Sequence, residues 1–143
     1  MTSSLEQNKA LMRRYIEEVW NKGDFDFIDK NFSADFVNHG TLLGQPADRD
    51  GIKWVIRNTR NAIPDLHLSI EDMVAEGDKV VTRWLAKGTH KGDFMGAKPT
   101  GNKISVSSTV IDRIKDGKVV EAWPIRDDLS VLQQIGLIPR FGG

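Results

Sequence analysis

Two hydrophobic repeats divide this chain into a helix-forming first half and a strand-forming second half. Before residue 62, apolar side chains recur three or four positions apart, which is the spacing of one helix face. The pattern predicts a helix capped by Ser3 or Ser4 and ended at residues 21–24, then helices over 25–31 and 46–61. Between the last two, residues 32–39 are expected to be extended and residues 40–45 to form a loop.

From Leu66 onward, apolar and polar residues alternate, as they do in strands that bury one face. Turns at 76–79 and 116–117 and a glycine-rich loop at 91–102 separate four expected strands, which a helix over 129–135 follows. Helices followed by an antiparallel meander predict an α+β fold, here as one domain over residues 1–143. The strands are long, roughly ten residues each, and long twisted strands curl, so we expect a cone that encloses a pocket.

Composition narrows the function classes. Among 143 residues, 20 Lys and Arg balance 20 Asp and Glu, so no basic excess points to a nucleic-acid partner. The absence of Cys excludes disulfides and thiolate chemistry. The N-terminus lacks the basic and apolar regions of a signal peptide, and every apolar run is far too short to span a membrane. We therefore expect a cytoplasmic protein with no membrane partner.

A series of short motifs runs along the chain in a fixed order. They are Asn21-Lys22-Gly23-Asp24, Phe36-Val37-Asn38-His39, Pro64-Asp65-Leu66-His67, Glu76-Gly77-Asp78-Lys79, Arg83-Trp84, Gly88-Thr89-His90, Pro99-Thr100-Gly101 and Asp116-Gly117-Lys118. In this order they resemble the SnoaL-like polyketide cyclases, or predicted ester cyclases, over about residues 8–136. The resemblance implies the cone-shaped α+β barrel of the nuclear transport factor two-like superfamily. It also implies a homodimer through the outer sheet face, and chemistry on apolar small molecules with no cofactor.

The resemblance breaks down at the catalytic positions. In the anthracycline cyclases of the family, an Asp and a His on neighbouring strands move protons during an aldol ring closure. Those positions fall on Pro124 and Val110, and neither side chain can carry a proton. Ketosteroid isomerase, which is similar in fold, has a tyrosine on its first helix. The corresponding position in this chain is Ile16, with Tyr15 one residue away. Pro124 also lacks a backbone N–H, so its part of the strand is expected at an edge or a bulge.

Three polar residues are the candidates for chemistry. His39 ends the expected extended segment at the pocket mouth, and His is the commonest acid/base residue; the alternative, with equal weight, is a hydrogen bond to a loop carbonyl. Asp127 matches the Asp of the family's Trp-x-x-x-Asp pattern, and the competing interpretation is an N-cap for the last helix. Arg126 shares a strand face with Ala122 and Pro124, where a guanidinium suits an anion or an oxyanion; the alternative is a rim position.

Other side chains are candidates for shaping a ligand pocket. They are Asn38, Trp84, His90, Phe94, Met95, Val110, Trp123 and Pro124. Phe94 and Met95 lie in the glycine-rich loop and so are candidates for a lid. His90 has a competing role in holding that loop. The spacing of the three His residues shows no paired ligands, so no metal site is expected.

Three functions remain open. The first is a cyclase, isomerase or lyase that moves a proton of an apolar carbonyl compound, with His39 as acid or base, Asp127 as its partner, and Arg126 or Asn38 stabilising an oxyanion. The second is a binding protein for an apolar ligand that has lost the cyclase acid and base. The third is an epoxide hydrolase, for which Arg126, Asp127 and Asp112 offer the residue types, although sequence neighbours on a strand face opposite ways.

Overall fold

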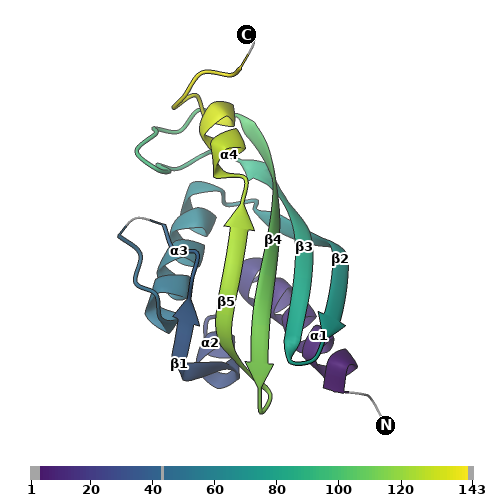
Figure 1. Ribbon diagram of the computed structural model, residues 1–143. Helices are drawn as coiled ribbons and strands as arrows, with labels where there is room; N and C mark the ends of the chain where they lie inside the picture. Colours follow the sequence, from purple (N-terminus) through teal and green to yellow (C-terminus); the bar gives the residue numbers. More distant parts are fainter. Residues whose placement is uncertain (1–3, 43, 142–143) are drawn as a thin grey trace.

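The computed structural model of the protein describes residues 4–42 and 44–141, and Figure 1 shows their arrangement. Ser3, one of the two expected helix caps, lies outside the described residues, and Ser4 is the first residue of α1. The helices are α1 (Ser4–Arg14), the π-helix η1 (Tyr15–Trp20), α2 (Asp26–Asn31), α3 (Arg49–Ala62) and α4 (Asp128–Gln134). The strands are β1 (Phe32–Asn38), β2 (His67–Glu76), β3 (Lys79–Thr89), β4 (Lys103–Lys115) and β5 (Lys118–Arg126).

The strands form one curved, unclosed sheet in the order β1-β5-β4-β3-β2. β2 to β5 are an antiparallel meander, as the alternating pattern predicts, whereas β1 adds to β5 in parallel. The pairing of β1 with β5 ends at Asn38 and Ala122, so Pro124 lies beyond the end of β1. On that side β5 is an edge, which explains how a residue without a backbone N–H is accommodated there.

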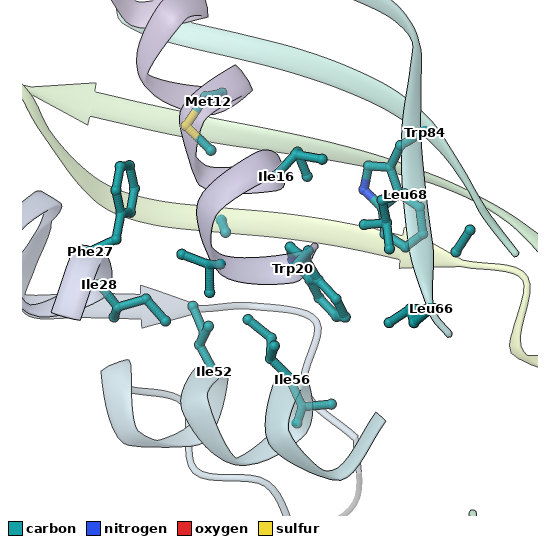
Figure 2. Packing of buried hydrophobic residues seen from close by; sticks show 14 of the residues in the cluster. Met12, Ile16, Trp20, Phe27, Ile28, Ile52, Ile56, Leu66, Leu68 and Trp84 are labelled. Atoms are coloured by element: carbon teal, nitrogen blue, oxygen red, sulfur yellow. The ribbon is translucent and has the colours of Figure 1, made fainter. Parts of the chain in front are cut away.

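The N-terminal helices cover the concave face of the sheet (Figure 1). Their apolar side chains pack against those of the sheet. Figure 2 shows Met12, Ile16 and Trp20 in line along α1 and η1, between the sheet and the α3 residues Ile52 and Ile56. Trp20 and Trp84 lie with their ring centroids 6.0 Å apart, so the first helical segment is joined directly to β3. Within residues 4–42 and 44–141, no helix combines the length and the apolar character that crossing a bilayer requires.

Two local features differ from the sequence prediction. The third helix begins at Arg49 rather than at residue 46, because the side chain of Asp48 accepts a hydrogen bond from the N–H of Gly51 and caps the helix there. The first helix changes to a π-helix at Tyr15, where each turn holds more residues than an α-helical count assumes. As a result Tyr15 and Ile16, although adjacent in sequence, both line the cavity described next.

Candidate active site

A cavity of about 60 Å³ lies between the first helical segment, α3 and the concave face of β3 to β5. We call it the inner cavity. Most of its wall is apolar, formed by side chains such as Met12, Ile16 and Val55. Its polar wall residues are Tyr15, Asn38, Thr82, Asp112 and Arg126. A mostly apolar cavity into which a few polar groups converge is the usual form of a small-molecule site.

Asp112 is the most unusual of these groups. It lies on β4, is only 4% exposed, and faces inward with its register partners Val80 and Ala122. Among the described residues, no basic side chain pairs with its carboxyl group and no donor hydrogen-bonds it. Burial therefore raises the pKa of the Asp112 carboxyl from its ordinary 3.8 to about 8. At neutral pH most molecules hold Asp112 in its protonated form.

Tyr15 faces the same cavity and is coupled to Asp112. Burial, and after it the nearby charge of Asp112, raise the pKa of the Tyr15 phenol, while Trp20 and Arg126 partly oppose this shift. The ring is fixed between Phe27 and Phe32, whose centroids lie 6.3 and 5.1 Å from its own. The phenol therefore stays protonated at any physiological pH and can donate a hydrogen bond into the cavity.

Five residues that the sequence proposed for the site line the inner cavity. They are Asn38, Trp84, Val110, Pro124 and Arg126. Arg126 shares a face of β5 with Ala122 and Pro124, as the strand alternation predicts. The Oδ1 atom of Asn38 accepts a hydrogen bond from the Gly40 N–H at 2.9 Å, so its amide NH₂ is the group that can donate into the cavity.

His39 lies elsewhere. Its side chain is 40% exposed, its Nε2 lies 2.8 Å from a carboxylate oxygen of Glu121, and its ring stacks on Trp123 at 5.0 Å. Hydrogen bonds from His39 and then Arg113 hold the pKa of the Glu121 carboxyl below its ordinary value. Neither His39 nor Trp123 is among the residues that line the inner cavity. Their proposed roles in catalysis and ligand binding stay predictions, without support from this geometry.

Asp127 and His90 each have a structural partner. The Asp127 carboxylate accepts a hydrogen bond from the Ser130 N–H at 3.1 Å and caps α4, the alternative that the sequence left open. Asp127 is absent from the inner cavity wall. The three residues considered for an epoxide hydrolase, Arg126, Asp127 and Asp112, therefore do not all line that cavity. His90 is fully buried, and its Nδ1 lies 3.0 Å from Thr100 Oγ1, across the base of the loop at 91–102.

Phe94 and Met95 line a second compartment, also of about 60 Å³, that adjoins the inner cavity. They belong to a tight turn in which the backbones of Phe94 and Ala97 exchange hydrogen bonds of 3.0 and 2.8 Å. Met95 has a φ of 52°, a left-handed conformation that few non-glycine residues adopt. Within the described part of the chain, no three His, Asp or Glu side chains come together to hold a metal ion.

The sequence analysis missed Asp112 as the central residue and considered it only for epoxide hydrolysis. A signal was available, because Asp112 has the same strand parity as the inward residues Ile104, Val110 and Ile114. An acidic residue in a run of core positions indicates a buried carboxyl. Tyr15 was not chosen because the residue count from the turn at 21–24 placed the corresponding tyrosine on Ile16, one residue away.

An unclosed curved sheet wrapped around helices, with a cavity on its concave side, is the architecture of the nuclear transport factor two-like proteins. The chain belongs to the SnoaL-like polyketide cyclase family, which it matches over residues 10–135. It is 27% identical to the aklanonic acid methyl ester cyclase DnrD of Streptomyces peucetius over 131 residues. The matched region covers 88% of each of the two chains.

Two solved structures show the same architecture. AclR of Streptomyces galilaeus, a proposed hydroxylase, is 33% identical, with a TM-score of 0.84 over 96% of this chain and 85% of its own. IdmH of Streptomyces antibioticus, a proposed polyketide cyclase, is 33% identical, with a TM-score of 0.78 over 91% of this chain and 99% of its own. The family supports a cyclase-type enzyme that works without a cofactor, but these neighbours differ in their assigned chemistry, so the reaction must be argued from the site.

Proposed function

We propose that this protein is a cofactor-independent cyclase that forms a carbon–carbon bond within an apolar carbonyl compound, using Asp112 as the base and Tyr15 as the hydrogen-bond donor. The observation that carries the proposal is the presence of both side chains in one small, mostly apolar cavity. An unpaired buried carboxyl lowers the stability of a folded protein, and strongly perturbed carboxyls in cavities are common at functional sites.

The proposed reaction begins with proton abstraction. The ionised Asp112 carboxylate takes a proton from the carbon next to the substrate carbonyl, and the electron pair of that C–H bond moves to the carbonyl oxygen. The Tyr15 hydroxyl donates a hydrogen bond to the enolate oxygen, where negative charge develops. The enolate carbon then attacks a second carbonyl of the same molecule and forms the ring bond. Protonated Asp112 returns its proton to the resulting alkoxide.

The raised pKa of Asp112, about 8, suits this role. A carboxylate with a higher pKa is a stronger base, and a general base works best when its pKa lies near the working pH. At pH 7 only about one molecule in ten has Asp112 ionised, and the fraction grows as the pH rises. The surrounding apolar wall that raises the pKa also strengthens the hydrogen bond from Tyr15 to an enolate.

Asp112 lies close in the sheet to Pro124, the position that the resemblance gives to the cyclase Asp. In the sheet register, Val110 is opposite Pro124 and Asp112 is opposite Ala122. Asp112 is therefore the diagonal neighbour of Pro124 on the same face, about 7–8 Å away between strands. The carboxyl of this protein is displaced by one step along the sheet from the position where the resemblance implies the cyclase Asp. A displaced base implies that the substrate is held in a different orientation.

The first experiment is deuterium exchange at the α-carbon of a cyclic ketone, with 2-tetralone as the probe, followed by proton NMR in D₂O. We expect Asp112→Asn to lower the protein-catalysed exchange rate by about 10² or more, and Tyr15→Phe to lower it by about tenfold to 10². His39→Ala is the comparison, because His39 is the acid/base group that the sequence favours. A large loss in His39→Ala with normal exchange in Asp112→Asn would reverse the assignment.

The second candidate function is a binding protein for an apolar ligand. The observation that favours it is that Pro124 and Val110 line the cavity where the cyclases keep their acid and base. This function predicts saturable binding of the ketone with no exchange above background in the wild type. It also predicts that Asp112→Asn binds the ketone as well as the wild type does.

A further inference from the structure

Three hollows follow one another from the surface to the inner cavity. The outermost is a groove of about 630 Å³ between α3 and the loop at 91–102, with Trp54 and Asp93 on its rim. It shares Leu42, Phe94 and Met95 with the second compartment. The second compartment in turn shares wall residues, among them Trp20 and Trp84, with the inner cavity. The three hollows therefore adjoin one another in series, and the innermost is lined by Asp112 and Tyr15.

The second compartment differs from the inner cavity in its chemistry. Most of its wall consists of aliphatic and aromatic side chains, and its polar members are Thr59, Arg126 and Asp128. Trp20 and Trp84, which Figure 2 shows close together beside Leu68, line both spaces. This compartment has no group that could take a proton from carbon except Asp128, which is engaged by Arg126. It can bind an apolar group but offers no evident chemistry.

Arg126 occupies the junction of the two spaces. It lines both of them, and its side chain is only 17% exposed. Among the described residues, its ion-pair partner is Asp128, 3.5 Å from Nε, which leaves the two terminal nitrogens of the guanidinium for a ligand. A guanidinium binds a carboxylate through two parallel hydrogen bonds, and in a buried place it needs such a partner.

A buried hydroxyl belongs to the residue opposite Arg126 in the sheet. Ser108 is the register partner of Arg126 on one side and of Trp84 on the other, and it faces inward with 4% exposure. Its Oγ atom has no hydrogen-bond partner among the described residues. Ser108 is not among the residues that line either hollow, so Arg126 supplies the positive charge at the point where the apolar compartment meets the cavity of Asp112.

We propose that the second compartment and Arg126 together bind an apolar carboxylate, with the carboxylate on Arg126 and the hydrocarbon part under Phe94 and Met95. Together with the proposed reaction, this site makes the substrate a keto acid, and for that conclusion the inference rests on the proposed function. The ketone would extend past the two tryptophans to Asp112 and Tyr15, while the carboxylate stays at the junction. The Arg126 and Phe94–Met95 sites then set specificity, whereas Asp112 acts on the substrate.

Methyl groups of methionine can test this directly. The chain has four methionines. Met95 lines the second compartment, Met12 lines the inner cavity, and Met73 lies away from both on β2. We would titrate protein labelled with ¹³C at the methionine methyl groups with octanoate, and with octanamide as its uncharged counterpart. Octanoate has no ketone, so its binding does not depend on proton transfer by Asp112.

We expect octanoate to shift the Met95 methyl signal in a saturable way and to bind at least tenfold more tightly than octanamide. Arg126→Gln should weaken octanoate by about tenfold or more and leave octanamide within twofold. Arg83→Gln is the matched control, since Arg83 is exposed on the outer face of β3. From butanoate to octanoate, affinity should rise about threefold to fourfold per methylene as the compartment fills.

Several results would overturn the inference. Equal affinity for octanoate and octanamide in the wild type would show that no cation selects the ligand. Equal octanoate affinity in Arg126→Gln and the wild type would remove Arg126 from the site. A shift of Met12 without Met95 would place the hydrocarbon in the inner cavity instead. If octanoate binds as expected while 2-tetralone shows no exchange, the proposed reaction fails and the carboxylate site stands.

Discussion

Replacing Asp112 by Asn should make the stability of the protein much less dependent on pH. In the folded wild type the pKa of Asp112 is about 8, against an ordinary value of 3.8. Between these two values the folded state holds a proton that the unfolded state has released. Stability therefore falls as the pH rises, by about 1.4 kcal/mol per pH unit in this window. Asn has a similar size and no titratable proton, so this loss disappears.

The measurement is urea unfolding, followed by tryptophan fluorescence, at pH 5, 6, 7 and 8. From pH 5 to pH 7, the wild type should lose roughly 3 kcal/mol of unfolding free energy relative to Asp112→Asn. Asp35→Asn makes the same chemical change at an exposed position on β1 and serves as the control. Stability curves for the wild type and Asp112→Asn that stay parallel within about 0.5 kcal/mol would show that the carboxyl is not desolvated. The case for Asp112 as a strong base would then be lost.

The remaining predictions concern the reaction, the cap, the anion site and the assembly. If the Asp112 carboxylate is the base, the 2-tetralone exchange rate should rise with pH and level off above about 8, and a rate that falls over this range would mean that the protonated carboxyl acts instead. Asp127→Ala should cost about 1 kcal/mol of stability in urea without a tenfold change in exchange, because it removes the α4 cap. Asp128→Asn should tighten octanoate in the methionine titration, since the carboxylate that competes for Arg126 is gone. Light scattering should show a homodimer that Ile125→Glu disrupts, because Ile125 is 75% exposed on the outer sheet face; an unchanged dimer would put the interface elsewhere.

Most of the fold could be predicted from the sequence because its signals are local. The meander is specified by the alternation of apolar and polar residues over β2 to β5 and by the turns between its strands. Two of these turns contain Gly77 and Gly117, which have positive φ. The parallel addition of β1 to β5 could not be foreseen, since a short extended segment does not indicate its partner. The π-helix at Tyr15 was also hidden, because the same apolar residues satisfy a regular helical count.

The candidate site was harder to predict because it depends on which groups share one enclosed space. His39 and Asp127 have the residue types that catalysis uses, yet one pairs with Glu121 outside the cavity and the other caps a helix. Arg126 was placed correctly on the inward face of β5, because strand alternation is a local rule. Asp112 could have been placed by the same rule, but its importance comes from the absence of a partner, which only the packed structure reveals.

The unpaired state of Asp112 also bears on the choice between an enzyme and a binding protein. A protein that only holds an apolar ligand has no need of an ionisable carboxyl, and replacing such a buried group by a neutral one commonly stabilises a fold. An anion site would not explain Asp112 either, because Arg126 supplies the positive charge and Asp112, whenever it is ionised, would repel the ligand. A base for carbon acids, however, works best when its pKa lies near the working pH and a hydrogen-bond donor lies where charge develops. Asp112 and Tyr15 in one cavity fit this description, so the proposed enzyme function gives the stability lost at Asp112 a purpose that the binding function does not require.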